Sequence, residues 1–324
     1  MNQNPSGFGP TASLQAIRAR ARLYQQIRDF FRRRDVLEVE TPLLSSAAVT
    51  DVHLVSITAQ RHLYGQLKTA YLQTSPEFAM KRLVASGSGP IYQICKVFRD
   101  DEHGRKHNSE FSMLEWYRPD FDLNQLMQEV TDLLTCILDY PVAPETLSYK
   151  EAFQHRLDIN PLTADVELLK KTSQRVGLSI DLADDRLAWL DVLFSHFVEP
   201  TLGYNQPVFL TDFPAEMASL AKVRTDEEGI PVAARFELYI DGLELANAYD
   251  ELADSQEQAR RFAADNLERS QRELPVVPVD EHLLKALAHF PPCAGIALGL
   301  DRLLMVLLNT QRIEQVISFP ASLT

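Results

Sequence analysis

The sequence predicts an α+β fold, in which a mostly antiparallel sheet is flanked by helices. The clearest sign is a β-hairpin over 235–252, RFELYIDGLELANAYDEL, with Asp241-Gly242 as its two-residue turn. A second pair of strands, PIYQICKVF (90–98) and FSMLEWYR (111–118), lies on either side of a charged loop. Strands paired by hairpins, with helices between the blocks, are typical of α+β proteins.

The first elements follow from apolar spacing and turn signals. An amphipathic helix with a basic outer face is expected first, because apolar residues recur at helical spacing while seven arginines lie between positions 18 and 34. Its apolar stripe consists of Leu14, Ile17, Ala21, Tyr24, Ile27 and Phe31. VLEVETPLL (36–44) predicts a strand that ends at Thr41-Pro42. The next helix is expected to begin near Ser75-Pro76, because proline suits the first helical turn.

The later elements complete this pattern. A mainly helical segment, punctuated by prolines, is expected from about 123 to 200. PVFLTDFP (207–214) is typical of a short strand, and a helical stretch rich in Glu, Arg and Gln follows the hairpin. GIALGLDRLLMVLLN (295–309) predicts a strand that leads into a helix. We expect residues 1–324 to form a single domain.

Composition narrows the classes of function. The 324 residues carry 45 acidic and 32 basic side chains, a net charge of −13, which argues against extensive binding of tRNA or DNA. No apolar run is long enough to span a membrane, and the polar N-terminus lacks the apolar core of a secretory signal. Three scattered cysteines indicate neither a disulfide framework nor a zinc site. These features predict a cytoplasmic protein.

Two carboxylates on the hairpin are candidate metal ligands. A two-residue turn places Tyr239 opposite Glu244 and Glu237 opposite Ala246. Glu237 and Glu244 would then project from one face as diagonal neighbours, roughly 7–8 Å apart. Magnesium fits such a pair, because it prefers one or two carboxylates together with substrate phosphates. The alternative is a solvated face of an exposed hairpin.

Two arginines and one strand face are candidates for binding a charged ligand. Arg99, at the end of a strand, can bind a phosphate or carboxylate through two parallel hydrogen bonds, although pairing with a neighbouring acidic side chain is the alternative. Glu115 and Tyr117 share one face of their strand, where a sheltered carboxylate needs a cation. Arg302 follows Gly299 at a strand-to-helix junction and is a second candidate anion binder.

Three separated segments resemble the signature motifs of class II aminoacyl-tRNA synthetases. LEVETP (37–42) resembles motif one, FRDDE (98–102) with HNSEF (107–111) resembles motif two, and GLDR (299–302) resembles motif three. ELAN (244–247) strengthens the likeness, and the lysyl-tRNA synthetases are the most similar group. Those enzymes place an anticodon-binding barrel before motif one, and the 37 residues before Glu38 cannot hold one. The chain is thus similar to the elongation factor P–(R)-β-lysine ligase family.

The resemblance implies a role for each candidate. Arg99 and Arg302 would be the catalytic residues, and Glu237 and Glu244 would hold Mg²⁺. The implied ATP-binding residues are Arg99, Asp100, Asp101, Asn108, Phe111, Glu244, Leu245, Gly299 and Arg302. The implied substrate-binding residues are Ser75, Pro76, Glu77, Glu115, Tyr117, Asn247 and Glu251. Among these, Glu115, Tyr117 and Glu251 would form a cage for the ε-ammonium of the substrate.

Departures from the lysyl enzymes bear on the substrate. Ala297 replaces a glycine at the back of the pocket, and the GGA-x-ARPF-like loop is missing between Pro42 and Ser75. Both changes lie where the α-amino group would be handled, so they favour (R)-β-lysine, with α-lysine left open. Asp100 and Asp101 stand where Asn and Glu are more usual, and Ala248 stands where lysyl enzymes usually have Gly.

A regular strand without a bulge would place two of the implied site residues, Glu244 and Glu251, on opposite faces of the sheet. Alternation places Glu244 and Glu251 on opposite faces of the sheet. Both can face one site only if the strand bulges or bends near Ala246-Asn247.

The resemblance implies an ATP-dependent ligase that forms an aminoacyl adenylate and transfers the aminoacyl group to a lysine of elongation factor P. It also implies a homodimer, because motif one usually builds the dimer interface of this fold. Two alternatives stay open: a compact lysyl-tRNA synthetase that charges tRNA, and a non-catalytic paralogue of the synthetases. Because Arg99, Glu237, Glu244 and Arg302 are all retained, the catalytic interpretation is favoured over the second alternative.

Overall fold

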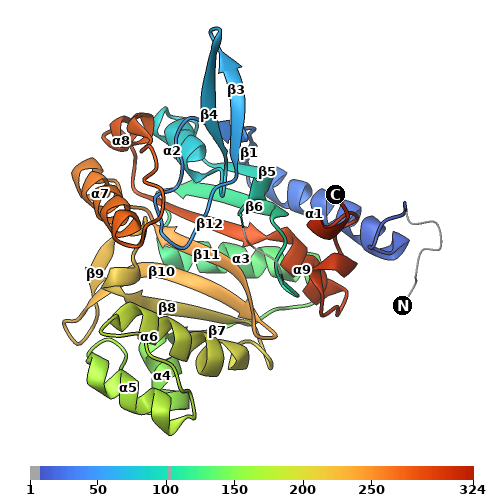
Figure 1. Ribbon diagram of the computed structural model, residues 1–324. Helices are drawn as coiled ribbons and strands as arrows, with labels where there is room; N and C mark the ends of the chain where they lie inside the picture. The colour runs from blue at the N-terminus through green and yellow to red at the C-terminus, as the bar shows by residue number, and fades with distance from the viewer. Residues whose placement is uncertain (1–7, 101–103) are drawn as a thin grey trace.

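A mixed sheet forms the centre of the structure, a computed structural model that describes residues 8–100 and 104–324 (Figure 1). Nine described strands build it, in the order β1-β5-β6-β12-β11-β10-β8-β7, with β9 paired to β10. The strands are β1 (Leu37–Glu38), β5 (Ile91–Phe98), β6 (Glu110–Pro119), β7 (Glu145–Ser148), β8 (Val208–Pro214), β9 (Val223–Thr225), β10 (Pro231–Ile240), β11 (Leu243–Asp250) and β12 (Cys293–Gly299). Only the pairs β1–β5 and β7–β8 are parallel in the described part of this sheet, so the predicted α+β fold with a mostly antiparallel sheet is confirmed.

Helices pack against the sheet in three groups, each with its own buried apolar cluster. They are α1 (Leu14–Arg32), α2 (Glu77–Ala85), α3 (Leu123–Leu138), α4 (Tyr149–Leu157), α5 (Val166–Arg175), α6 (Arg186–Leu193), α7 (Ser255–Gln271), α8 (Glu281–Leu287) and α9 (Leu300–Leu307). α1, α3 and α9 cover the largest cluster, α4 to α6 pack beside β7 and β8, and α2, α7 and α8 share the third. Short π- and 3-10 turns occupy Phe194–Val198, Glu199–Thr201, Ala215–Met217, Ile313–Gln315 and Ala321–Leu323.

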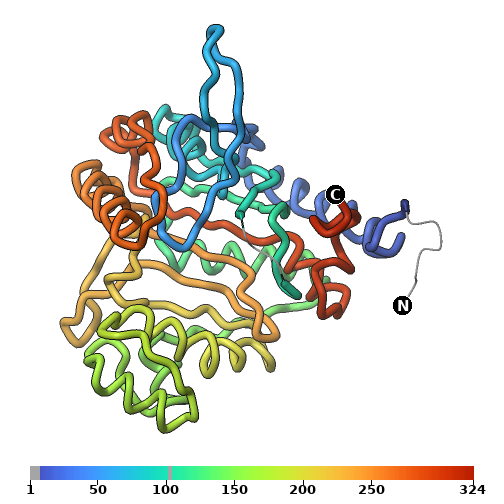
Figure 2. The backbone as a smooth tube through the Cα atoms, viewed as in Figure 1, coloured from blue at the N-terminus to red at the C-terminus, as the bar shows by residue number. Residues whose placement is uncertain are grey.

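A separate three-stranded sheet projects from the body of the protein (Figures 1 and 2). It consists of β2 (Leu44–Ser45), β3 (Thr58–Leu63) and β4 (Gln66–Leu72), in the order β2-β4-β3. The tip of the hairpin between β3 and β4 is Tyr64-Gly65, and both residues have a positive φ. Within the described ranges, no helix combines the length and apolar character that crossing a bilayer requires.

Two expectations about the first hundred residues are wrong in part. The predicted strand over 36–44 is interrupted: Leu37 and Glu38 form β1, which pairs with β5, and Leu44 begins β2, which pairs with β4. The helix α1 forms as predicted and buries Ile27 and Phe31, but Leu14 is 68% exposed. Ala21 is exposed as well, and the buried side of the helix instead includes Ala16, Leu23 and Phe30. The apolar face is therefore rotated from the predicted stripe.

The hairpin between β10 and β11 confirms the predicted turn and corrects its register. Asp241 and Gly242 have φ values of 53° and 66°, which is the geometry of a type I′ turn. Tyr239 lies opposite Glu244, as expected, but Glu237 pairs with Asn247 instead of Ala246. The register shifts between Leu238 and Tyr239, since one residue of β11, Leu245, is extra.

This bulge allows side chains at even and odd positions of β11 to face the same side of the sheet. Leu245 and Ala246 are both buried in the core, whereas Glu244 and Asn247 are partly exposed, and both of these polar residues line the cavity described below. The expected bulge therefore exists, one residue earlier than Ala246-Asn247, and it turns two side chains of different parity toward the same side.

Candidate active site

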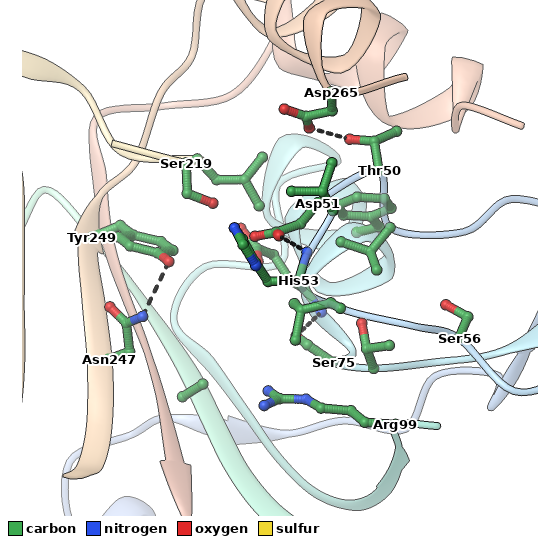
Figure 3. A pocket seen from close by; sticks show the side chains of 18 of the residues that line it. Thr50, Asp51, His53, Ser56, Ser75, Arg99, Ser219, Asn247, Tyr249 and Asp265 are labelled. Atoms are coloured by element: carbon green, nitrogen blue, oxygen red, sulfur yellow. Dashed lines mark hydrogen bonds between the residues drawn. The ribbon is translucent and has the colours of Figure 1, made fainter. Parts of the chain in front are cut away.

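A cavity of about 1180 Å³ lies over one face of the sheet, where strands β10 to β12 meet α2, α6, α7 and the loop over 45–56 (Figure 3). Its lining includes most of the predicted site. The predicted residues that line it are Ser75, Pro76, Glu77, Arg99, Asn108, Phe111, Glu237, Glu244, Leu245, Asn247, Gly299 and Arg302. Asp100, Glu115, Tyr117 and Glu251 do not line it, and Asp101 lies outside the described residues.

Glu115 and Tyr117 lie directly beneath the cavity and are linked to it by Ser75. The Ser75 hydroxyl donates a hydrogen bond of 2.7 Å to Glu115 Oε2, and the Tyr117 hydroxyl donates one of 2.8 Å to Glu115 Oε1. Both side chains of β6 are almost fully buried. Burial, together with the nearby Glu77, raises the pKa of Glu115 to about 8.

A lysine that the sequence analysis missed joins the other two carboxylates of this group. Lys81 Nζ lies 2.6 Å from Glu77 Oε1 and 2.5 Å from Glu251 Oε2, and the Lys81 side chain is only 1% exposed. The two carboxylates hold the pKa of Lys81 above its ordinary value although burial acts in the opposite direction. The available signal was the spacing of Glu77 and Lys81, four residues apart on one helix.

Burial also raises the pKa of Glu251 to about 8, against the lowering effect of Lys81. A glycine on β12 makes room for this carboxylate. A Cβ added to Gly295 would lie 2.2 Å from Glu251 Oε1 and 2.5 Å from Tyr117 Cε1.

We call Glu77, Lys81, Glu115, Tyr117 and Glu251 the charged cluster. It holds three carboxylates and one ammonium, so it has a surplus of negative charge whenever the carboxylates are ionised.

The two candidate catalytic arginines also line the cavity. The Arg99 guanidinium lies 5.1 Å from the centre of the Phe111 ring. Arg302 follows the N-terminus of α9, where its Nη1 donates to the Glu244 carbonyl at 2.8 Å and to Glu244 Oε2 at 3.3 Å. Arg302 Nη2 is also 2.8 Å from His107 Nε2. Two guanidinium groups and a helix N-terminus favour the binding of an anion here.

The start of α9 is fixed by a buried carboxylate. Asp301 accepts a hydrogen bond of 2.6 Å from the Ser112 backbone N–H, and it forms an ion pair with Arg20 of α1. These contacts join α9 to β6 and α1, so that the next residue, Arg302, is held at the cavity wall.

Glu237 and Glu244 face the same cavity from neighbouring strands. Glu237 is paired with Arg235 and accepts a hydrogen bond from Tyr239. Burial raises the pKa of Glu237 to about 7; Arg235 opposes this rise and Glu244 adds to it. Within residues 8–100 and 104–324, no three His, Cys, Asp or Glu side chains are arranged to hold a metal ion by themselves.

The two candidate asparagines have different surroundings. Asn108 is buried, and both ends of its amide are engaged, since Nδ2 donates to the Glu110 carbonyl at 2.6 Å and Oδ1 accepts from the Ala321 N–H at 3.0 Å. Asn247 donates to the Tyr249 hydroxyl at 3.2 Å, while its buried Oδ1 has no hydrogen-bond partner in the described part of the chain (Figure 3). Asn247 is therefore an acceptor available to a ligand.

The loop over 45–56 is a second feature that the sequence analysis missed. Its residues Thr50, Asp51 and His53 line the cavity (Figure 3). The Thr50 hydroxyl donates to Asp265 Oδ2 at 2.5 Å, and the buried Arg269 of α7 donates to the Asp51 carbonyl at 3.0 Å. The loop is thus held against α7. Its residues match no motif by themselves, so only the fold places them at the site.

Comparison with known proteins agrees with the geometry. The family model of class II tRNA synthetases (D, K and N) matches residues 10–323. The chain is 49% identical to the elongation factor P–(R)-β-lysine ligase of Edwardsiella ictaluri, with 97% of each chain covered. The proteins of the same name from Pectobacterium carotovorum (97% of each chain covered) and Yersinia pestis strain Pestoides F (98% of each) are both 48% identical to it. The chain therefore belongs to the class II tRNA synthetases, and within them to the elongation factor P–(R)-β-lysine ligase family.

Proposed function

We propose that this protein activates (R)-β-lysine, or lysine, with ATP and transfers it to the ε-amino group of a lysine on elongation factor P. The observation that carries the proposal is the charged cluster at the cavity, together with Arg99 and Arg302 in the wall of the same cavity. The relatives named for this activity, which match nearly the whole chain, support it.

The charge of the cluster supports a substrate with two amino groups. When its three carboxylates are ionised, they and the Lys81 ammonium leave two negative charges, which the two ammonium groups of a diamino acid would offset. Leaving a buried charge without a partner is costly, so an amino acid with a single ammonium would bind less well. Arg99 would orient the carboxylate of the substrate, which carries the opposite charge.

The first step joins the substrate carboxylate to the α-phosphate of ATP. A carboxylate oxygen attacks phosphorus in line, the bond to the β-phosphate oxygen breaks, and pyrophosphate leaves with the negative charge. Arg99 and Arg302 stabilise the charge that develops on the phosphates, mostly by being in position before the reaction. Phe111 offers a ring face at which the adenine of ATP can stack.

The second step transfers the aminoacyl group to the acceptor. The unprotonated ε-amine of the acceptor lysine attacks the carbonyl carbon of the adenylate, the carbon–oxygen bond to phosphate breaks, and AMP leaves while the nitrogen loses a proton. The mixed anhydride is reactive enough that no covalent intermediate with the protein is needed.

Glu237 and Glu244 are the residues that would hold magnesium. Both carboxylates face one cavity, and Glu244 contributes to the raised pKa of Glu237, which fits a divalent cation shared with substrate phosphates. When bound, magnesium would neutralise phosphate charge. Arg235 and Arg302 already hold these two carboxylates, so they orient both groups toward the cavity.

Ala297 supports a preference for β-lysine over α-lysine. Its position on β12 pairs with Glu115 on one side and with Asn247 on the other, and it lines the cavity. The methyl group takes space between these two polar side chains. An amino group moved by one carbon avoids this space and can still donate to Asn247 Oδ1, which has no other hydrogen-bond partner in the described residues.

The proposed function extends to the oligomeric state of the protein and to its location in the cell. We infer a homodimer, because Phe8, Leu14, Phe319 and Leu323 leave large apolar surfaces exposed where the segment before α1 bonds to residue 318 near the C-terminus. Residues 1–324 would serve as one catalytic domain. The net charge of −13 supports the absence of stable tRNA binding, and a translation factor as acceptor supports a cytoplasmic location.

Exchange of labelled pyrophosphate into ATP tests the activation step. With magnesium, the purified protein should catalyse exchange that depends on (R)-β-lysine or L-lysine, and norleucine, which lacks the ε-amine, should support none. Equal exchange with norleucine would contradict the role of the charged cluster. Exchange with neither diamino acid would contradict the proposed function itself.

A further inference from the structure

Lys81 is the one buried lysine among the described residues, and it connects the cavity wall to the interior. One of its partners, Glu77, lines the cavity, whereas the other, Glu251, lies behind the wall. Both contacts are short, at 2.6 and 2.5 Å, and Lys81 is held on α2 four residues after Glu77. Its ammonium is therefore an internal cation placed beside the binding site.

Without this ammonium, Glu251 would lose its ion-pair partner. Gly295 leaves just enough room for Glu251, since even a methyl group there would lie 2.2 Å from Oε1. Glu251 thus has little freedom to turn toward another donor. Glu77 is less confined, and without Lys81 it would be free to move within the cavity.

We propose that Lys81 is a positioning and specificity-determining residue, whose ammonium fixes the carboxylates of Glu77 and Glu251 and sets the charge of the pocket so that amino acids with two ammonium groups are preferred. The proposal deepens the proposed function and rests on it. Lys81 does not line the cavity, so it acts through the two carboxylates and not by touching the substrate.

The proposal has a consequence for pH dependence. The titratable groups that surround Lys81 and its partners come from α2, β6, β12 and the β11 region. They are Glu77, Glu115, Tyr117, Tyr249, Glu251 and Cys293. Lys81 lowers the pKa of both Glu115 and Glu251, so its removal should raise both. For Glu251, whose Oε2 lies 2.5 Å from Lys81 Nζ, losing this opposite charge should raise the carboxyl pKa by about 1 to 3 units.

The test compares the full-length wild-type protein with Lys81→Met, Lys81→Arg and a matched control in pyrophosphate exchange across a range of pH. The control is Arg118→Met, because Arg118 also pairs with a buried carboxylate, Glu129, but does not line the cavity. For Lys81→Met we expect the KM for (R)-β-lysine to rise about tenfold near neutral pH, with kcat within about threefold of the wild type. The inflection in log kcat/KM should move up by about 1 pH unit or more.

The other variants separate charge from packing. Lys81→Arg, which keeps the charge, should return the inflection toward its wild-type position, and Arg118→Met should leave it unmoved. If Lys81→Met does not fold, Lys81→Gln takes its place, because its neutral amide can still donate a hydrogen bond to a carboxylate. A folded neutral variant with unchanged KM and unchanged inflection would overturn the proposal. A wild-type protein inactive with both diamino acids would instead overturn the proposed function.

Discussion

Replacing Gly295 by alanine tests whether the position of Glu251 matters for binding. The new Cβ would lie 2.2 Å from Glu251 Oε1 and 2.5 Å from Tyr117 Cε1. The carboxylate would have to retreat by about 1 Å to reach an ordinary contact. The backbone of Gly295 does not have a positive φ, so alanine adds volume without backbone strain. The effect should therefore come from packing against the charged cluster alone.

We expect two effects of this substitution. Overpacking at a buried site costs about 1–3 kcal/mol of unfolding free energy, which should lower Tm by several degrees. Displacing Glu251 from its place behind the cavity wall, where it pairs with Lys81, should raise the KM for (R)-β-lysine by about 10- to 100-fold, equivalent to about 1.4–2.8 kcal/mol. Pyrophosphate exchange measures the KM, and thermal unfolding with and without the substrate measures stability.

The matched control for stability is Gly299→Ala on the same strand. Its Cβ would meet nothing closer than 3.8 Å, the distance to the Leu245 carbonyl oxygen, so Tm should change little. A folded Gly295→Ala protein whose KM stays within about twofold of the wild type would refute the reasoning that Glu251 is fixed for substrate binding.

Three further predictions concern the arginines, the metal and pH. Arg302→Ala should abolish exchange while circular dichroism and Tm stay near wild type. The control Arg312→Ala, whose partner Glu314 is on the surface, should keep its activity. If Arg302→Ala retained exchange, Arg302 would have no part in the mechanism. Glu237→Gln should raise the magnesium concentration needed for half-maximal exchange about tenfold or more, and an unchanged magnesium titration would exclude it as a ligand. The pKa values of Glu115 and Glu251 are raised to about 8, so the folded protein binds more protons than the unfolded chain above about pH 4.5. The unfolding free energy without substrate should therefore fall as pH rises from about 4.5 to 8. Added L-lysine should reduce that fall, because its ammonium groups favour the ionised carboxylates. Chemical denaturation at several pH values, with and without L-lysine, measures the change of unfolding free energy with pH. An equal change in both conditions would contradict this prediction.

The sequence was informative where a local signal determines the structure. The Asp241-Gly242 turn predicted the central hairpin, and the strand pair around the charged loop formed as expected. The extra residue at Leu245 was expected only because Glu244 and Glu251 had to share a face. Spacing alone gave the wrong partner for Glu237, because a bulge depends on packing on both sides of the strand.

Prediction failed where tertiary contacts decide. The stripe on α1 was predicted to include Leu14 and Ala21, but both are exposed in the described chain. Lys81 looked like an ordinary helical lysine, and its burial follows from the position of Glu251, which is 170 residues away along the chain. Such a contact cannot be predicted from a single sequence unless both residues belong to a known motif.

A competition between acceptors tests the central claim most directly. The purified protein would receive ATP, magnesium and labelled (R)-β-lysine or labelled L-lysine, with elongation factor P and bulk tRNA present in the same tube. We predict that the label joins elongation factor P, more from (R)-β-lysine than from L-lysine, and that tRNA carries none. Label on tRNA, or on neither acceptor, would contradict the account.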